Sequence, residues 1–314
     1  MKILIMGGTR FVGVALTKLL VSQGHEVVLF NRGNRPAPVA GIRVIHGDRT
    51  DPQQIKDQLA GEDFDAIFDN NARELQDAQT LIDLFTGRIQ HYVYMSSAGV
   101  YLESEILPHV EGDATDPQSR HKGKLDTESY LQQKYQKDGF PFTAIRPTYI
   151  YGPQNYNDIE AWFFDRICHD RPLPIPDRGL HITQLGHVSD LGRAMAAVLG
   201  KKLAVGQIYN VADPRYVTFL GLARACATVC GKPNYDRFVF YDAQKFGSAK
   251  RKAFPLRVQH FFTAVDKAMR QLDWQPEYDL LKGLETSYKD YVDSGRAQQP
   301  VDFSLDDQIL ASSP

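Results

Sequence analysis

The 314-residue sequence has few cysteines, no long apolar run and no excess of charge of either sign. It has three cysteines, and Cys226 and Cys230 lie four residues apart without the further His or Cys that a zinc site needs, so we interpret them as core thiols. No apolar run reaches the roughly 18 residues of a membrane span, and no basic leader precedes the first apolar residues. We therefore expect a cytoplasmic protein with no membrane partner.

The charge balance limits how the chain can bind a polyanion. Lys and Arg number 36 against 38 Asp and Glu, which gives a formal net charge of -2. A dedicated nucleic-acid-binding protein usually carries a basic surface and a high isoelectric point. Any binding of nucleic acid by this chain must therefore use a local basic region.

Apolar, strand-like runs alternate with amphipathic helical patterns through the first half of the chain. The runs cover residues 2–6, 26–31, 43–46, 66–69, 91–96 and 142–150, and the helical patterns cover 11–22, 51–60, 73–86 and 124–138. Continuous apolar strands that alternate with helices predict a parallel sheet covered on both faces. The fold class we predict is α/β, with a doubly wound parallel sheet and a smaller C-terminal α/β lobe.

The second half of the chain predicts a division into domains. After Gly152 and Pro153 the regular alternation ends, but a helix at 188–199 and a strand at 207–212 are expected to rejoin the sheet. Further helices are expected near 217–229, 263–272 and 280–292. We predict a dinucleotide-binding domain over 1–170 together with 185–212, a smaller lobe over 171–184 and 213–299, and a loosely attached tail over 300–314.

A glycine-rich loop joins the first predicted strand to the first predicted helix. Its residues are Gly7, Gly8, Thr9, Arg10, Phe11, Val12 and Gly13. Glycine near the strand end lets the turn form, Gly13 lets the helix pack on the sheet, and the helix N-terminus offers free N–H groups to a pyrophosphate. The loop therefore predicts a dinucleotide cofactor.

The loop resembles that of the extended short-chain dehydrogenase/reductases, the NAD-dependent epimerase/dehydratase family, with Arg10 in place of their middle glycine. Segment 92–101 resembles their catalytic-serine strand, segment 146–153 their nicotinamide-side turn, and segment 272–276 their C-terminal signature. The resemblance spans most of the chain. It implies a Rossmann fold that binds a nicotinamide dinucleotide.

The resemblance also indicates which cofactor is preferred. Family members that prefer NAD place an Asp at the end of the second strand to bind the adenosine ribose, whereas this chain has Asn31 and Arg32. Without that carboxylate a 2'-phosphate is not repelled, and Arg32 and Arg10 can bind it, so we expect NADP rather than NAD. Asp48 resembles the residue that caps the adenine, with a simple Asp turn as the alternative. Asn71, Lys124 and Pro147 complete the cofactor-binding residues that the resemblance implies.

The catalytic residues of the family are only partly present. Members use Ser or Thr, Tyr and Lys, and here Ser97 and Lys124 match the Ser and the Lys. Helical spacing places Arg120 where the Tyr should be, and a guanidinium with a pKa above about 12 cannot act as that acid. His121 can titrate near neutral pH, but it lies about a quarter turn away. We therefore expect ordinary dehydrogenase or epimerase chemistry to be weak, and Ser97 can equally be part of a strand-end turn.

The end of the fourth predicted strand is polar, where the family usually has small apolar residues. Asp69 and Asn71 could orient a water molecule or hold a hard cation such as magnesium. A hydrogen-bonded strand end is the interpretation that we favour.

Other segments resemble a narrower group, the chloroplast stem-loop-binding proteins and their cyanobacterial relatives. These segments are 7–13, 95–101, 119–125, 184–188, 252–255 and 259–262. The resemblance implies a short-chain dehydrogenase fold that binds RNA and has endoribonuclease activity stimulated by a divalent metal. It also suggests a cyanobacterial source.

A basic segment provides the local charge that RNA binding needs. Lys250, Arg251, Lys252 and Arg257 fall within residues 243–265, which contain no acidic residue and include several aromatic side chains. Cations neutralise phosphates and aromatic rings stack on unpaired bases. A solvated basic loop with its aromatic rings turned into the core is an equal alternative. Residues 120–124 could form a second anionic site, or hold a cofactor phosphate.

Three functions stay open at this point. The first is an RNA-binding, nuclease-like protein, the second an NADP-dependent sugar-nucleotide epimerase, dehydratase or reductase, and the third a non-catalytic NADP-sensing scaffold. Arg120 favours the first and third over the second, and the basic segment favours the first over the third. A homo-oligomer and a bound divalent metal also stay open.

Overall fold

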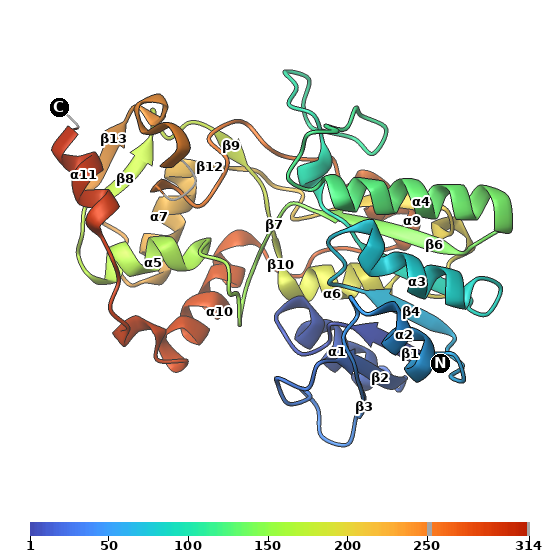
Figure 1. Ribbon diagram of the computed structural model, residues 1–314. Coiled ribbons are helices and arrows are strands. Elements are labelled where there is room, and N and C mark those ends of the chain that lie inside the picture. The colour runs from blue at the N-terminus through green and yellow to red at the C-terminus, as the bar shows by residue number, and fades with distance from the viewer. Residues whose placement is uncertain (250–252, 313–314) are drawn as a thin grey trace. The chain divides into compact units, whose positions relative to one another are not determined.

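The computed structural model describes residues 1–249 and 253–312, which form two compact units (Figure 1). Unit 1 comprises residues 1–148, 188–212 and 263–275. Unit 2 comprises residues 149–187, 213–262 and 276–314. Each unit has a hydrophobic core of its own.

Unit 1 is built on a seven-stranded parallel sheet, with strand order β11-β6-β5-β4-β1-β2-β3. The strands are β1 (Lys2–Met6), β2 (Glu26–Asn31), β3 (Arg43–His46), β4 (Ala66–Asp69), β5 (His91–Met95), β6 (Phe142–Pro147) and β11 (Gln207–Val211). The strand order runs outward in both directions from β1 and β4, which is the arrangement of a doubly wound fold. The predicted fold class is therefore confirmed.

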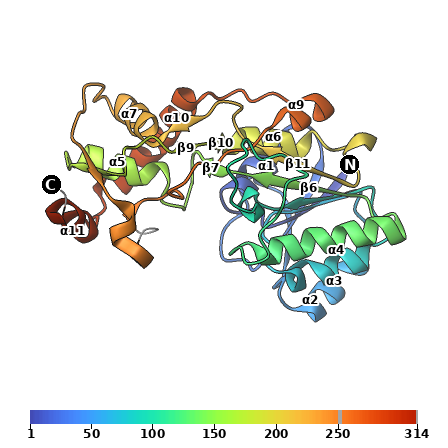
Figure 2. The same ribbon diagram turned by 90° about the horizontal axis from the view of Figure 1, so that it is seen from above.

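Helices cover both faces of this sheet, as Figure 2 shows. Helices α1 (Val12–Ser22) and α6 (Val188–Ala196) pack together on one face. The other face carries α2 (Pro52–Leu59), α3 (Leu75–Phe85) and α4 (Lys122–Asp138). The short helices η1 (Ala98–Val100) and η2 (Lys202–Ala204) lie in connecting segments. Helix α9 (Asp266–Leu272) packs beside β11 in unit 1, whereas the sequence assigns this segment to the smaller lobe.

The predicted strand over 142–150 is in fact two strands. Strand β6 ends at Pro147, and β7 (Tyr149–Tyr151) pairs with β10 (Leu185–His187) in a separate two-stranded sheet. Proline has no N–H with which to continue a ladder of hydrogen bonds, so pairing with the large sheet stops at this residue. An apolar run alone does not show such a change of partner.

Unit 2 packs three helices against one another, namely α5 (Glu160–Cys168), α7 (Phe219–Val229) and α10 (Leu280–Asp293). Strand β12 (Val217–Thr218) pairs with β9 (Ile182–Thr183), and β13 (Phe238–Tyr241) pairs with β8 (Leu173–Pro176). The short helices η3 (Ala243–Ala249) and η4 (Arg296–Gln298) also belong to this unit. The core between the three long helices is rich in aromatic rings, including those of Trp162 and Phe163.

The predicted loose tail contains a packed helix. Helix α11 (Ser304–Ser312) contacts β8 and β13, and its Ile309 is fully buried. The buried Asp306 carboxylate accepts a hydrogen bond from Arg166 at 2.8 Å. Asp307 also pairs with Arg171, and Leu305 packs against the same cluster as Ile309. The polar composition of this segment does not indicate these contacts. Over residues 1–249 and 253–312, no helix is both long and apolar enough to cross a membrane.

Candidate functional site

The glycine-rich loop follows β1 and leads directly into α1. Gly7 has a φ of +85°, and a Cβ atom on Gly13 would lie 2.0 Å from the Gly7 carbonyl oxygen. Glycine adopts this backbone conformation at Gly7 without strain, and a side chain at Gly13 would clash with that oxygen. The first turn of α1 has no acidic residue, so no carboxylate there competes with an anion for the positive end of the helix.

Two residues of the loop depart from a simple glycine turn. Arg10 is exposed, and its neighbour Phe11 is buried with a φ of +45°, a left-handed conformation that is unusual for a side chain of this size. Thr9 is half-buried, and Val12 is the first residue of α1. Burial of the Phe11 ring fixes the loop beside the sheet, with Arg10 directed to the surface.

Buried polar atoms gather at the carboxyl ends of the strands of this sheet. Among the described residues that end a strand of this sheet or directly follow one, Asn31, Asn70, Ser96 and Thr148 each have a buried polar atom that makes no hydrogen bond. They end β2 or follow β4, β5 and β6, and parallel strands bring their carboxyl ends to one edge of a sheet. Buried polar atoms are normally paired, so these atoms fit a polar ligand that lies along this edge.

The end of β2 carries the residues that the sequence predicts to lie beside the adenosine ribose. Asn31 accepts a hydrogen bond from the Gly33 N–H at 2.8 Å, and Arg32 is exposed beside it. The Asp48 carboxylate accepts hydrogen bonds from the backbone and hydroxyl of Thr50, and these bonds, with the charge of Arg32, lower the pKa of Asp48. Asp48 thus forms the turn that the sequence left as an alternative, and a contact with adenine stays a prediction.

The end of β4 is a hydrogen-bonded ion pair. The fully buried Asp69 carboxylate accepts hydrogen bonds from both Arg49 Nη atoms, at 2.6 and 2.8 Å, and from the Tyr92 hydroxyl at 2.7 Å. Burial by itself would raise the pKa of Asp69, but the Arg49 guanidinium and these hydrogen bonds hold it below its ordinary value. Arg49 also donates to Asn71 Oδ1 at 2.5 Å and to the Asp77 carbonyl at 2.7 Å. The sequence interpretation missed Arg49, although it directly follows the turn residue Asp48.

The hydrogen bonds at the end of β4 can be compared with the suggestion that Asp69 and Asn71 hold a cation. The Asp69 oxygens already accept bonds from Arg49 and Tyr92, and Asn71 Oδ1 accepts from the same guanidinium. Across residues 1–249 and 253–312, no group of three or more His, Cys, Asp or Glu side chains is placed to hold a metal ion. The end of β4 therefore fits the hydrogen-bonded strand end that the sequence favoured.

The variant Arg49→Ala should destabilise the protein strongly. It leaves the buried Asp69 carboxylate without its partner, a change that costs about 3 to 5 kcal/mol. Because the pKa of Asp69 is depressed in the folded protein, its stabilising contribution is present above the unfolded pKa of about 4 and is lost as the pH falls through the folded value. Urea unfolding should show the largest deficit at neutral pH and a smaller one in acid.

Arg43→Ala is the matched control for this variant. Arg43 pairs with Glu62 at 2.5 Å, but its side chain is 52% exposed, and exposed ion pairs contribute about 0 to 1 kcal/mol. An equal loss in the free energy of unfolding in Arg43→Ala and Arg49→Ala would show that the buried pair stabilises the protein no more than the exposed pair does.

Ser97 and Lys124 both contact the segment at the end of β5, but they bind different groups there. Ser97 Oγ accepts the Gly99 N–H at 3.0 Å, so Ser97 caps η1 and forms a strand-end turn. Lys124 projects from α4, donates to the carbonyl oxygen of Met95, and lies 5.3 Å from the centre of the Tyr94 ring. Burial lowers the pKa of Lys124 to about 8, a shift that Asp69 opposes and Arg49 increases. Pro147 is buried at the end of the neighbouring β6.

Arg120 and His121 lie outside the helix that carries Lys124. Helix α4 begins at Lys122, and His121 occupies its N-cap position. The helical spacing that we used to place Arg120 on the face of Lys124 therefore does not apply, because Ser119 and its backbone form a turn at this point. Arg120 Nε instead donates to His121 Nε2 at 3.1 Å. Residue 120, four residues before Lys124, is an arginine where the family has a tyrosine. In the structure this position is part of a turn and not of the helix.

In unit 2, three of the four basic residues predicted to bind RNA lie outside the described residues, namely Lys250, Arg251 and Lys252. Arg257 is half-buried, its N–H donates to the Tyr149 hydroxyl at 2.8 Å, and its guanidinium lies 4.7 Å from the centre of the Phe261 ring. Arg257 is thus fixed in place by two aromatic residues of unit 2.

The aromatic residues of this segment divide into two groups. Phe254 is fully buried against Trp162, Phe163 and Phe219, and Phe261 is buried against Tyr149. The alternative that aromatic rings turn into the core therefore holds for these two. His260 is exposed, and the half-buried Phe262 contacts the exposed Tyr216 with ring centres 4.4 Å apart. Of these four residues, His260 and Phe262 are the two that a ligand can reach.

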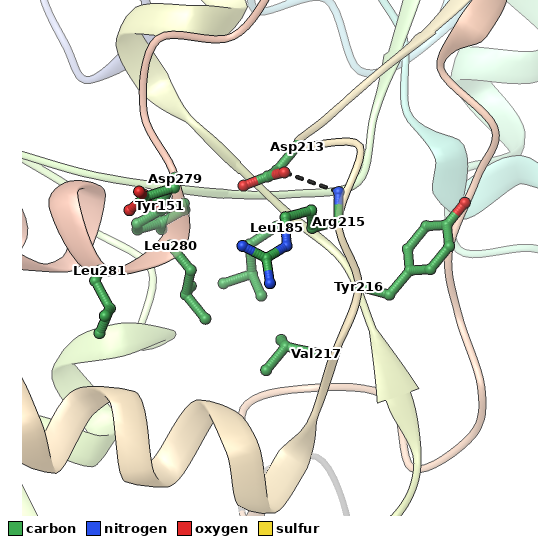
Figure 3. A pocket seen from close by; sticks show the side chains of 9 residues that line it. All are labelled: Tyr151, Leu185, Asp213, Arg215, Tyr216, Val217, Asp279, Leu280 and Leu281. Carbon is green, nitrogen blue, oxygen red and sulfur yellow. Dashed lines mark hydrogen bonds between the residues drawn. The ribbon is translucent and has the colours of Figure 1, made fainter.

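Tyr216 also lines a cavity of about 240 Å³ in unit 2, shown in Figure 3. The other lining residues are Tyr151, Leu185, Asp213, Arg215, Val217, Asp279, Leu280 and Leu281. The Arg215 side chain points toward Leu185 and Leu280, and its backbone N–H donates to the Asp213 carboxylate at 2.8 Å. Apolar walls with one guanidinium and two carboxylates suit a flat, polar-edged ring.

Comparison with known proteins decides the family. The model of the NAD dependent epimerase/dehydratase family matches residues 3–212, about two thirds of the chain. The chain belongs to this family. Chloroplast stem-loop binding protein of 41 kDa b from Arabidopsis thaliana is 47% identical to this epimerase/dehydratase-family chain over 324 residues, covering 99% of this chain and 84% of the relative.

Solved structures show how widely this epimerase/dehydratase-family fold is shared. A UDP-glucose 4-epimerase from Thermotoga maritima has a TM-score of 0.79 and 18% identity, covering 94% of this chain and 99% of its own. An epimerase from Methanothermobacter thermautotrophicus has a TM-score of 0.78 and 20% identity, covering 94% and 93%. At such identities the likeness establishes the fold alone.

Proposed function

We propose that this chain binds RNA through unit 2 and NADP(H) through unit 1. The observation that carries the RNA proposal is 47% identity, over 99% of the chain, to a protein named for binding stem-loops. The replacement of the family tyrosine by Arg120 argues in the same direction, because it removes the acid that the ordinary reaction needs. Binding of a labelled stem-loop RNA by the purified protein tests the proposal directly.

The carboxyl edge of the unit 1 sheet suits the cofactor. The N-terminus of α1 favours the negative pyrophosphate, and the unpartnered polar atoms of Asn31, Asn70, Ser96 and Thr148 can bind the rest of the dinucleotide. Asn71 and Pro147 lie at the same edge, where Lys124 donates to the Met95 carbonyl at the end of β5. A bound nicotinamide dinucleotide supplies or accepts a hydride.

NADP(H) should bind more tightly than NAD(H), because Arg32 and Arg10 can form charge-assisted hydrogen bonds with the 2'-phosphate. Such a contact contributes roughly 1.5 to 3 kcal/mol. Calorimetry with both cofactors should show this preference in the parent protein and its loss in Arg32→Ala. Arg35→Ala, an exposed arginine in the same loop, is the control and should keep the preference. Equal affinities in the parent, or an unchanged preference in Arg32→Ala, would remove this argument.

The surface of unit 2 that we propose for RNA combines charge with accessible rings. Arg257 can contact phosphate, together with Lys250, Arg251 and Lys252. His260 and Tyr216 are exposed and can stack on unpaired bases. Phe262, at the end of the basic segment, contacts Tyr216, which lines the cavity of Figure 3, so one base could enter that cavity beside Arg215.

Endoribonuclease activity with a divalent metal is a further activity that the resemblance implies. The described part of the chain has no cluster of ligands that fits a resident metal ion, so we derive no cleavage step through one.

Cys168, Cys226 and Cys230 are all free thiols, which suits a reducing compartment such as the cytoplasm.

A further inference from the structure

Arg215 brings a positive charge to the cavity of unit 2 (Figure 3). Its side chain points toward the apolar side chains of Leu185 and Leu280. Within residues 1–249 and 253–312, its guanidinium donates no hydrogen bond to the protein and pairs with no carboxylate. A guanidinium has five N–H donors and no acceptor, so it can bind a ligand that presents acceptors. The cavity therefore contains a donor group that the protein itself leaves for a ligand.

The backbone that carries Arg215 is fixed at both ends. The Arg215 N–H donates to the Asp213 carboxylate at 2.8 Å, and the Asp213 N–H donates to the carbonyl of Leu185, the first residue of β10, at 3.0 Å. Two residues after Arg215, Val217 pairs with Thr183 between β12 and β9. The Asp213 carboxylate and the Arg215 guanidinium therefore project from a single turn that is attached to β10 and β9.

The size and walls of the cavity suit a single base. Its volume of about 240 Å³ lies below the roughly 300 to 1,000 Å³ of pockets for drug-sized ligands. The side chains of Leu185, Val217 and Leu280 offer apolar surface to the faces of a ring. The Asp213 carboxylate adds acceptors at its edge, since a carboxylate has about four acceptor sites and can bind a ligand besides the Arg215 N–H.

We propose that this cavity binds a guanine base, with Arg215 donating to O6 and N7 and the Asp213 carboxylate accepting from N1–H and the N2 amino group. Guanine is the one common RNA base that has two acceptors side by side on one edge and two donors on the adjacent edge. Adenine has a donor next to its N7, and the pyrimidines have no N7. The donor and acceptor groups of the cavity therefore favour guanine over the other three bases.

Two sources can supply this ring. One is an unpaired guanosine of an RNA chain, and this source rests on the proposed RNA function. The other is a free guanine nucleotide, which needs no RNA binding. The chemistry that the cavity recognises is the same in both.

The first test measures the affinity of the full-length protein for guanosine monophosphate (GMP) and for the adenine, cytosine and uracil monophosphates. Calorimetry is done with saturating NADP, so that the adenine nucleotide does not occupy the proposed cofactor edge. We expect GMP to bind roughly tenfold or more tightly than each of the others, because a bidentate contact discriminates by about this factor. Equal affinities, or no binding of GMP, would overturn the proposal.

Two analogues of GMP test the contacts without any substitution in the protein. The 7-deaza analogue lacks the N7 that Arg215 is proposed to contact, and inosine monophosphate lacks the amino group that Asp213 is proposed to contact. Each should bind roughly tenfold more weakly than GMP, since each loses a hydrogen bond to a charged group. An analogue that binds as tightly as GMP would contradict its contact, and the test stands even if a variant fails to fold.

The variant Arg215→Ala tests the donor. It should weaken GMP binding and abolish the difference between GMP and its 7-deaza analogue. Arg224→Ala, which removes an exposed arginine of α7 that does not line the cavity, is the matched control and should keep both. A difference that persists unchanged in Arg215→Ala would overturn the proposal.

Two stem-loop RNAs that differ only in a loop guanosine or adenosine distinguish the sources. A preference for the guanosine loop that Arg215→Ala removes supports the site and identifies RNA as the source. A preference for GMP without one for the guanosine loop supports the site with a free nucleotide. RNA binding without a preference for GMP overturns the guanine site and leaves the proposed RNA function, whereas a preference for GMP without RNA binding does the reverse.

Discussion

Replacing Lys250, Arg251, Lys252 and Arg257 together by Ala is expected to weaken binding of stem-loop RNA strongly and about equally for different RNA sequences. Each lost phosphate contact should reduce the slope of log affinity against log salt by roughly 0.7 to 0.9 units, so four contacts reduce it by roughly 3 units. Affinity measured at several salt concentrations, by fluorescence anisotropy with a labelled stem-loop, checks this. NADP binding should survive, because the proposed cofactor site is in unit 1.

The matched control removes the same charge from elsewhere. It replaces four exposed lysines of unit 1 by Ala: Lys18, Lys56, Lys137 and Lys202. If only net charge matters, the slope of log affinity against log salt should fall by the same amount in both variants. If the variant of the basic segment binds NADP but keeps the parental salt slope, the segment is only a solvated loop. The cluster at residues 120–124 then becomes the candidate, and NADP should compete with RNA.

Epimerase, dehydratase and ketoreductase turnover is expected to be absent or feeble. A positioned general acid or base typically contributes about 10²- to 10⁴-fold to the rate, and at the position of the family tyrosine this chain has Arg120, which cannot lose its proton near neutral pH. Ser97 and Lys124 are present, but Ser97 caps a turn and Lys124 binds the Met95 carbonyl. Assays of NADP-dependent turnover with sugar nucleotides and simple carbonyl compounds check this expectation.

The controls for that assay separate a missing acid from a missing cofactor. NADP binding is measured on the same preparation, so that lack of turnover is not due to an empty site. Rapid turnover that disappears in both Ser97→Ala and Lys124→Ala would contradict the expectation and support an epimerase, dehydratase or reductase.

The sequence predicts the fold of unit 1 well, because a buried parallel sheet produces clear patterns of apolar residues in the sequence. Its strands are continuous apolar runs between helical patterns, and the glycine loop marks the start of α1. Unit 2 is harder to predict, since its strands have only two to four residues and pair with distant partners. Helix α11 is attached largely by Ile309 and Asp306, which no local pattern distinguishes from an exposed helix.

The site shows a similar limit. Local motifs identify the glycine loop and the missing tyrosine, because each depends on residues close together in sequence. The sequence did not identify Arg49 because its partner Asp69 is 20 residues away in the chain. That Phe254 and Phe261 turn inward, while Tyr216 stays exposed, also depends on packing that spacing does not determine.

The most direct test of RNA binding on this dehydrogenase-like scaffold is a titration of the purified protein against a labelled stem-loop RNA, with and without saturating NADP. The account predicts saturable binding that weakens steeply as salt rises and changes little with NADP, because the proposed RNA surface is in unit 2 and the proposed cofactor edge is in unit 1. Absence of saturable binding at low salt would contradict the central claim. Binding that NADP abolishes would instead move the RNA site to the cofactor edge.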